Sequence, residues 1–165
     1  MDKTKLMRII LAVILGLVIV SGVVYNCLSE ENLEQAYIIC MPNDRVNIRL
    51  GPSRTSSSEG WCEAGDIVYL DGKFKHGYAH CVGLGVEAGE GWIHKGYIVY
   101  EEPEYVNCSA TIVSKSRLAA RKYVGGKRTR WLKAGAQLKV YYWTESWSLT
   151  NCGYVQSKFL ELNGV

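Results

Sequence analysis

Beyond residue 36, hydrophobic and polar positions alternate over short distances, as they do in β-strands. Apolar and β-branched residues come in short runs separated by Gly and Asp clusters such as Leu70-Asp71-Gly72. No stretch there keeps a helical apolar period long enough for a substantial helix. The pattern predicts strands at 37–39, 45–49, 67–70, 78–82, 91–94 and 98–100, and again at 111–113, 117–121, 138–142, 146–150, 153–155 and 159–162.

The second set of strands repeats the sequence of the first. Three blocks recur in the same order at offsets of 72, 70 and 62 residues: 45–49 at 117–121, 61–68 at 131–138, and 91–98 at 153–160. Arg, Trp and Ala-Gly positions are kept while the loops change length, which indicates a duplicated domain. We expect one repeat at 36–102, a short acidic linker at 103–106 and a second repeat at 107–165. Five or six short strands in about 60 residues suit a small barrel that closes its own edges.

The amino terminus predicts a membrane anchor. An uncharged, mostly aliphatic run at 9–25 follows a basic flank at 1–8, and a polar spacer at 26–35 separates it from the repeats. A helix of this length is about 26 Å long, at the short end of what spans a bilayer. The basic flank favours a single-pass signal anchor with the flank in the cytoplasm and the repeats outside the cell membrane. The alternative is a cleaved signal peptide, with small residues Val20 and Gly22 near the cleavage site, which would secrete the repeats.

The net charge of +3 hides an asymmetry between the repeats. Residues 36–106 carry six basic and ten acidic side chains, whereas residues 107–165 carry ten basic and two acidic. The first repeat is therefore acidic and the second strongly basic. A basic surface favours anionic polymers or lipid headgroups as partners. Nucleic acid is not expected for an exported domain.

The ends of the first repeat resemble the bacterial SH3 (SH3b-like) domain family. The resemblance rests on Val46-Asn47-Ile48-Arg49-Leu50-Gly51-Pro52-Ser53 and on Gly91-Trp92-Ile93-His94 followed by Tyr97-Ile98. The second repeat departs from the family, with Ala119 for the asparagine and Tyr154 for the tryptophan. The resemblance implies an all-β fold of two tandem small SH3-like barrels preceded by one transmembrane helix. It also implies extracytoplasmic binding, commonly to peptidoglycan peptides or other wall components. It does not imply an activity of its own.

Candidate ligand-binding residues fall into two groups. Those of the first repeat match the family positions, and those of the second form an aromatic pair and a basic loop tip: Asn47, Arg49, Trp92 and Tyr97, then Trp143, Trp147, Lys127, Arg128 and Arg130. Exposed tryptophan offers a flat apolar face to sugars or extended peptides. Structural roles compete with each of these interpretations. Arg49 and Arg121 could brace loop carbonyls, half of the aromatics could be core, and the basic loop could be merely solvated.

The sequence does not favour an enzyme. A papain-like peptidase needs a nucleophilic Cys with a His and a polar orienting group. The only histidines are His76, His80 and His94, and adjacent His80 and Cys81 would point to opposite faces of a strand. The cysteines lack the spacing of metal ligands, so we expect no metal and no cofactor.

The six cysteines suit disulfides in an exported protein. We expect a Cys108–Cys152 bridge, because the ends of such a barrel lie close together. Cys62–Cys81 is the nearest remaining pair, with Cys40–Cys81 as the alternative. Cys27, next to the membrane, could pair with Cys40 or link two chains into a homodimer.

These observations predict a non-catalytic extracytoplasmic binding protein of a bacterial cell envelope. It would hold wall peptide or glycan, or an anionic wall polymer. The alternative is a membrane-anchored adaptor or sensor ectodomain that binds and regulates an envelope enzyme.

Overall fold

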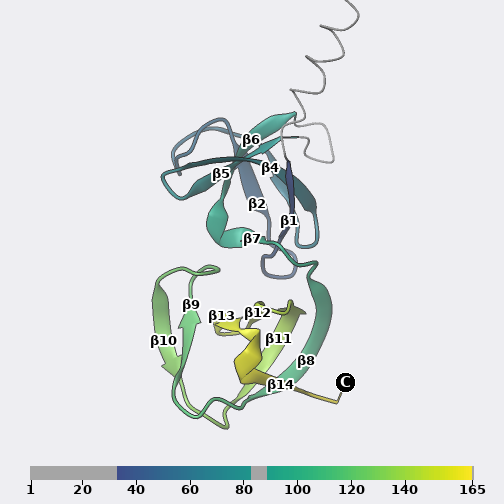
Figure 1. The fold of residues 1–165 in the computed structure, drawn as a ribbon, viewed down its shortest axis with the longest axis vertical. Helices are drawn as coiled ribbons and strands as arrows, with labels where there is room; N and C mark the ends of the chain where they lie inside the picture. Colours follow the sequence, from purple (N-terminus) through teal and green to yellow (C-terminus); the bar gives the residue numbers. More distant parts are fainter. Residues whose placement is uncertain (1–32, 83–88, 165) are drawn as a thin grey trace, which may run out of the picture. The chain divides into compact units, whose positions relative to one another are not determined.

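The described part of the chain is all-β and is built from two antiparallel sheets of seven strands each (Figure 1). The computed structural model describes residues 33–82 and 89–164, and the residues from Glu34 onward belong to one compact unit. Within this described part there is no α-helix, only two 3-10 turns, η1 (Lys95–Tyr97) and η2 (Ser157–Phe159). The all-β class predicted from the alternating pattern is thus confirmed.

The strands divide evenly between the two repeats. The first sheet comprises β1 (Glu34–Ile38), β2 (Val46–Arg49), β3 (Ser58–Cys62), β4 (Ile67–Lys75), β5 (Tyr78–Val82), β6 (Glu90–His94) and β7 (Ile98–Val99). The second comprises β8 (Glu104–Ile112), β9 (Leu118–Arg121), β10 (Arg128–Leu132), β11 (Gln137–Trp143), β12 (Trp147–Thr150), β13 (Gly153–Gln156) and β14 (Leu160–Asn163).

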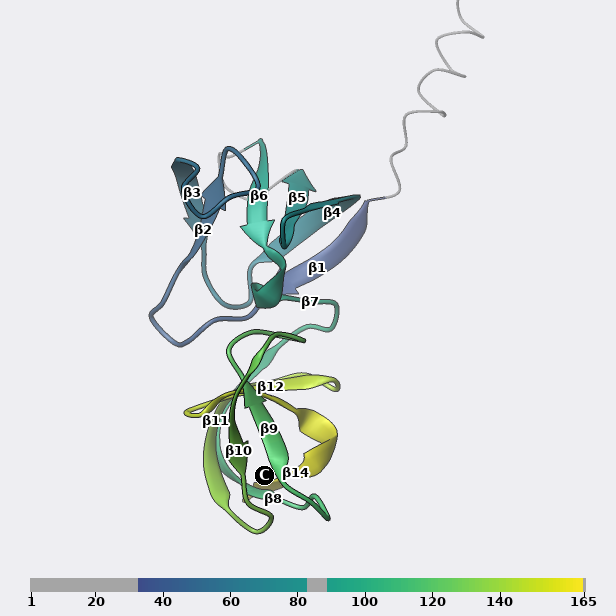
Figure 2. The same cartoon turned by 90° about the vertical axis from the view of Figure 1, so that its left-hand side faces the viewer.

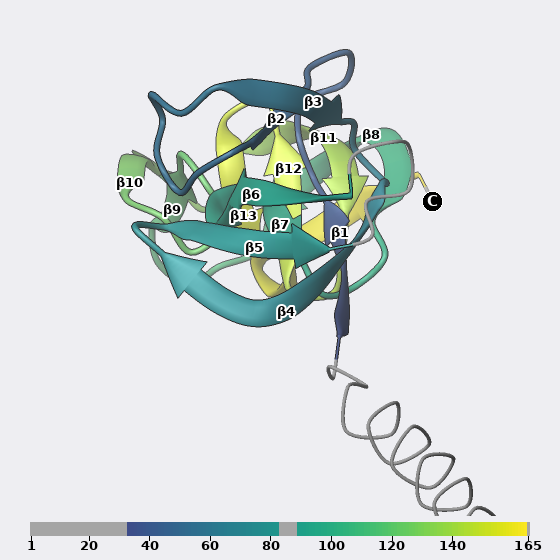
Figure 3. The ribbon, with the colours of Figure 1, turned by 90° about the horizontal axis from the view of Figure 1, so that it is seen from above.

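Both sheets have the same strand order. The first runs β3-β2-β6-β5-β4-β1-β7, and the second runs β10-β9-β13-β12-β11-β8-β14, which is the same order with every strand number raised by seven. Figure 3 shows β4, β5 and β6 side by side in the first sheet, and Figure 2 shows β9 beside β10 in the second. The sequence duplication is therefore a duplication of fold.

Matching details extend to single hydrogen bonds. The amide of Gly65 donates to the carbonyl of Ile38 at 2.8 Å, and the amide of Gly135 donates to that of Ile112 at 2.8 Å. Each glycine has a positive φ, +94° and +76° respectively, a conformation that glycine adopts without strain. The repeated Ala-Gly pair thus marks the same turn in both repeats.

Each repeat has its own apolar core, because alternate residues of its strands point inward. Ile38, Val68 and Ile93 are fully buried in the first core, and Val140 and Val155 in the second. A third cluster joins the repeats, with residues from both: Ile39, Val99, Leu149 and Tyr154.

Polar contacts reinforce that junction. The side chain of Glu101 accepts hydrogen bonds from the backbone amide of Ser146 at 3.1 Å and from its hydroxyl. The amide of Val124 donates to the carbonyl of Gly96 at 3.0 Å. The two repeats are therefore packed together as well as linked by the chain.

Several boundaries differ from those predicted. Strands β3 and β10 were not expected, since most of their residues are polar and exposed edge positions. Residues 104–106 of the expected linker belong to β8, because Glu104 and Tyr105 pair with Trp143 and Tyr142 of β11. Residues 34–35 of the expected spacer belong to β1.

The five cysteines among the described residues are free thiols, so none of the expected bridges among them is formed. Cys40, Cys62 and Cys81 are buried apolar members of the first core. Cys108 and Cys152 are half-buried. Cys27 lies outside the described residues.

The predicted anchor at 9–25 and the flank at 1–8 also lie outside the described residues. Among residues 33–82 and 89–164, no helix has the length and apolar character needed to span a membrane.

Candidate functional site

A cavity of about 610 Å³ opens over the outer face of β2. The alternation of β2 turns Val46 and Ile48 into the core and Asn47 and Arg49 outward. Pro52, in the loop after β2, contributes to the wall. Tyr78 of β5 and the β6–η1 segment form the opposite wall. The site therefore rests on several strands of the first sheet.

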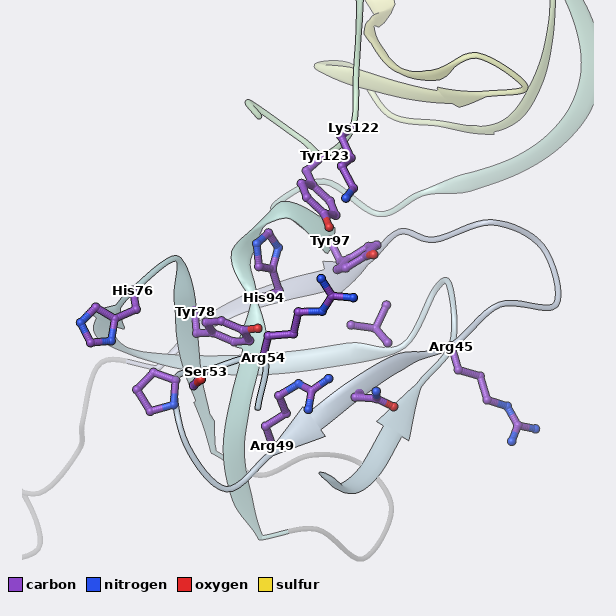
Figure 4. Close-up of a pocket in the computed structure, with 13 residues that line it drawn as sticks. Arg45, Arg49, Ser53, Arg54, His76, Tyr78, His94, Tyr97, Lys122 and Tyr123 are labelled. Carbon is purple, nitrogen blue, oxygen red and sulfur yellow. The ribbon is translucent and has the colours of Figure 1, made fainter. Parts of the chain in front are cut away.

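The lining is cationic. Arg45, Arg49, Arg54 and Lys122 all line the cavity, and no carboxylate is among its lining residues. In Figure 4, Arg54 extends toward Tyr97 while Arg45 points away from the centre. Such an arrangement attracts an anionic group, and arginine in particular offers a planar fork to carboxylate or phosphate.

Arg49 also has a structural role. Its Nη1 donates to the carbonyl of Ser56 at 2.7 Å, and the equivalent Arg121 donates from Nη1 to the carbonyl of Gly126 at 2.8 Å. Each arginine therefore braces the loop that follows its strand, as the sequence suggested. The brace fixes the side chain of Arg49 with other donors still available to a ligand.

His94 occupies the centre of an aromatic cluster on the opposite wall. Its ring centroid lies 5.3 Å from that of Tyr78, 5.9 Å from that of Tyr97 and 4.5 Å from that of Tyr123. Nδ1 accepts a hydrogen bond from the amide of Gly96 at 3.2 Å, so the neutral ring carries its proton on Nε2. Burial, followed by the charges of Lys95 and Lys122, lowers the pKa of His94.

The second repeat completes the cavity. Lys122 and Tyr123 come from the loop between β9 and β10, and Tyr123 points toward Tyr97 and His94 (Figure 4). The ring centroids of Tyr97 and Tyr123 lie 5.3 Å apart, and burial followed by the neighbouring Tyr123 raises the pKa of Tyr97. A ligand in this cavity would therefore contact both repeats.

Of the candidate residues in the first repeat, the structure brings Asn47, Arg49 and Tyr97 together at this cavity. Trp92 is not among the lining residues. It is half-buried in β6, and its ring centroid lies 4.9 Å from that of His80.

The candidates in the second repeat do not gather at one place. Trp143 packs against the second core and Trp147 against the cluster between the repeats, so neither offers the exposed face that was expected. Arg128 and Arg130 lie on edge strand β10 and not at a loop tip, and Lys127 precedes the strand. Arg128 stacks on Trp131, with its guanidinium carbon 4.4 Å from the ring centroid.

Several residues of the cavity were not predicted from the sequence. Arg54 and Tyr123 come from loops of different repeats, and His94 ends strand β6, so no local pattern groups them. The exposed tryptophans, Trp61 and Trp131, which are 48% and 49% exposed, were not predicted as contacts either. Their recurrence at equivalent repeat positions was the available signal.

The strand that carries His80 and Cys81 separates them, as expected. Cys81 is buried in the core, whereas His80 Nδ1 lies 2.8 Å from Oδ2 of Asp71. Within the described part of the chain, no cluster of three or more His, Cys, Asp or Glu residues could hold a metal ion.

No protein-family model matches the chain, and no curated protein matches it. Among solved structures it is similar to NlpC1 from Trichomonas vaginalis, with 16% identity and a TM-score of 0.35 over 82% of this chain and 48% of that one. It is also similar to NlpC2 from the same organism, with 15% identity and a TM-score of 0.34 over 82% of this chain and 50% of that one. The chain spans about half the length of these structures. Similarities of this degree carry no argument for its fold or function.

Proposed function

We propose that this chain is a non-catalytic binding protein of a bacterial cell envelope. In this proposal each sheet is an SH3-like barrel of the bacterial type, and the apolar segment at 9–25 anchors both barrels outside the cytoplasm. The identical strand order of the two sheets, in which the first strand along the chain pairs with the last, supports a tandem pair of one small fold. The resemblance of residues 46–53 and 91–98 to bacterial SH3 domains supports the family.

The cationic cavity over β2 is the binding site in this proposal. The observation that carries it is the lining itself, with three arginines and a lysine around the cavity and no carboxylate. Wall peptides present carboxylates and anionic wall polymers present phosphates, and both suit arginine donors. The tyrosines beside these cations offer apolar faces to the rest of the ligand.

Sedimentation of the full-length protein with purified sacculi tests this function. Arg54→Ala combined with Lys122→Ala removes two exposed cations from the cavity. We expect this double variant to bind sacculi about tenfold more weakly, because two solvent-exposed charge contacts of up to about 1 kcal/mol each are lost. Lys75→Ala combined with Lys139→Ala removes the same charge from exposed strand positions outside the cavity and should bind like the unmodified protein.

Sacculi stripped of anionic polymers identify the ligand. Retained binding assigns the cavity to wall peptide or glycan, and lost binding assigns it to the polymer. If the protein binds neither preparation and cross-linking instead captures an envelope protein, the wall-binding function is wrong and the adaptor alternative holds.

A further inference from the structure

The second sheet carries a smaller cavity at the place equivalent to the first. Its volume is about 260 Å³, and its lining includes Arg117, Ala119, Arg121, Trp131, Gln156 and Phe159. Five of these correspond through the sequence repeat to lining residues of the first cavity: Arg45, Asn47, Arg49, His94 and Tyr97. The duplicated fold has therefore kept a cavity in both copies.

The chemistry of the second cavity differs from that of the first. Gln156 and Phe159 replace a histidine and a tyrosine, so neither of these titratable side chains lines the second cavity. Ala119 pairs in register with Trp131 of the edge strand, and the small methyl leaves the indole beside the cavity. Trp131 lines this cavity, whereas the equivalent Trp61 does not line the first.

The two arginines of the second cavity are differently engaged. Arg121 braces its loop through Nη1. Arg117 is exposed and makes no salt bridge within the described residues, while its counterpart Arg45 lies 3.6 Å over Trp61 and pairs with Glu63. No carboxylate is among the lining residues of the second cavity. Arg117 is thus positioned to receive an anion at the mouth of the cavity.

Neutral polar groups complete the lining. Ser114, Ser116 and Gln156 line the cavity together with the arginines and the aromatic side chains. Hydroxyl and amide groups of this kind exchange hydrogen bonds with the hydroxyls of a sugar. The volume lies below the roughly 300–1,000 Å³ of sites for drug-sized ligands and suits a group about as large as one sugar ring.

We propose that this second cavity binds a carboxylate-bearing sugar ring. Arg128 already lies 4.4 Å over the Trp131 ring, so the sugar ring contacts the indole where it lines the cavity and packs against Phe159. The carboxylate pairs with Arg117, and Gln156 and the serines contact ring hydroxyls. An aromatic face contributes apolar contact to a sugar, and arginine adds a bidentate, charge-assisted pair to its carboxylate. The site is separate from the cavity over β2, and its test does not depend on the function proposed for that cavity.

Nuclear magnetic resonance titration of the full-length protein with methyl β-glucuronide tests the proposal. The indole N–H signal of Trp131, assigned by its absence in Trp131→Phe, should shift and saturate at millimolar concentrations, a binding free energy of about 4 kcal/mol. Neutral methyl β-glucoside should bind about tenfold more weakly, as judged from the same indole signal, because this sugar lacks the carboxylate that pairs with Arg117.

Variants locate the contact. Arg117→Lys keeps the charge but loses the planar fork, and it should weaken the Trp131 response to the acidic sugar. Arg54→Ala in the first cavity should leave that response unchanged. The proposal fails if both sugars shift the indole equally, if saturable shifts appear only around the first cavity, or if Trp131 does not respond at about 50 mM sugar.

Discussion

The hydroxyl of Tyr154 donates a hydrogen bond of 2.7 Å to the carbonyl oxygen of Ile39, which lies 115 residues earlier in the chain. Tyr154 is 4% exposed and Ile39 is fully buried, so water cannot replace either partner. The bond joins β13, the second-last strand of the second repeat, to the residue that follows β1 in the first. It lies in the apolar cluster between the repeats and gives that junction a directional contact.

Tyr154→Phe should lower the free energy of unfolding by about 1–3 kcal/mol, because it leaves the buried carbonyl of Ile39 without its donor. Urea denaturation measures this loss. Tyr105→Phe, at a position 56% exposed, is the matched control and should change stability by less than about 0.5 kcal/mol. Equal stability of the two variants would show that the bond contributes nothing to the junction.

His94 should make stability depend on pH. The pKa of its imidazole is lowered in the folded protein below the ordinary value of 6.5. As the pH falls, His94 is therefore protonated in the unfolded chain at a higher pH than in the folded protein. Stability is therefore at its full value above about pH 6.5 and is lost as the pH falls toward and through the folded pKa. Protonation would also oppose the hydrogen bond from the Gly96 amide to Nδ1.

His94→Gln, which copies the residue at the equivalent position 156, should flatten this dependence between pH 7.5 and 5.5. Urea denaturation at both pH values gives the slope, which is independent of any uniform loss from the missing ring. His76→Asn alters an exposed turn residue and should keep the slope of the unmodified protein. A slope that survives in His94→Gln would assign the titration to another group.

The core thiols should resist alkylation. Burial, the largest cause, raises the pKa of Cys62 and of Cys81 from 9.0 to about 12, which reduces the reactive thiolate about a thousandfold at neutral pH. Iodoacetamide and mass spectrometry should find both residues unmodified in the folded protein and modified in urea without reductant. If they stay unmodified in urea, a disulfide protects them and the free-thiol assignment is wrong.

Asp71 should titrate as an unusually strong acid. Burial opposes its ionisation, but hydrogen bonds from Lys73 and His80 outweigh that effect and lower the pKa of the carboxyl to about 2. The stabilisation is fully present above pH 3.8 and is lost as the pH falls through about 2. In His80→Phe, the carboxyl carbon signal should titrate at a higher pH. An unchanged titration midpoint would show that His80 does not lower the pKa of Asp71.

More of the fold than of the candidate site could be predicted from the sequence. Repeated Arg, Trp and Ala-Gly positions indicated the duplication, and strong alternation located most strands. Strands β3 and β10 were not predicted, because these edge strands have exposed polar residues on both faces and show no alternation of apolar and polar positions. The first residues of the long strand β8 were not predicted either, because most of them are exposed.

The cavity was predictable only where it follows β2. Asn47 and Arg49 share the outward face of one strand, and the period of two fixes that relationship locally. Lys122 and Tyr123 reach the cavity through the packing of two repeats, which no local pattern encodes. Whether the side chain of Trp143 is buried or exposed likewise depends on tertiary packing, because the sequence does not show which face of β11 meets the core.

The pairing of β14 with β8 sets the order in which the molecule can be completed during synthesis. Leu160 pairs with Ile112 and Leu162 with Ala110. One edge of β8 therefore has no pairing strand until nearly the whole second repeat has been synthesised. The first repeat has all its strands once Val99 has emerged, whereas a chain interrupted before Leu160 would present an open strand edge. A ribosome that stalls late in this chain would therefore release a finished first domain joined to an aggregation-prone second.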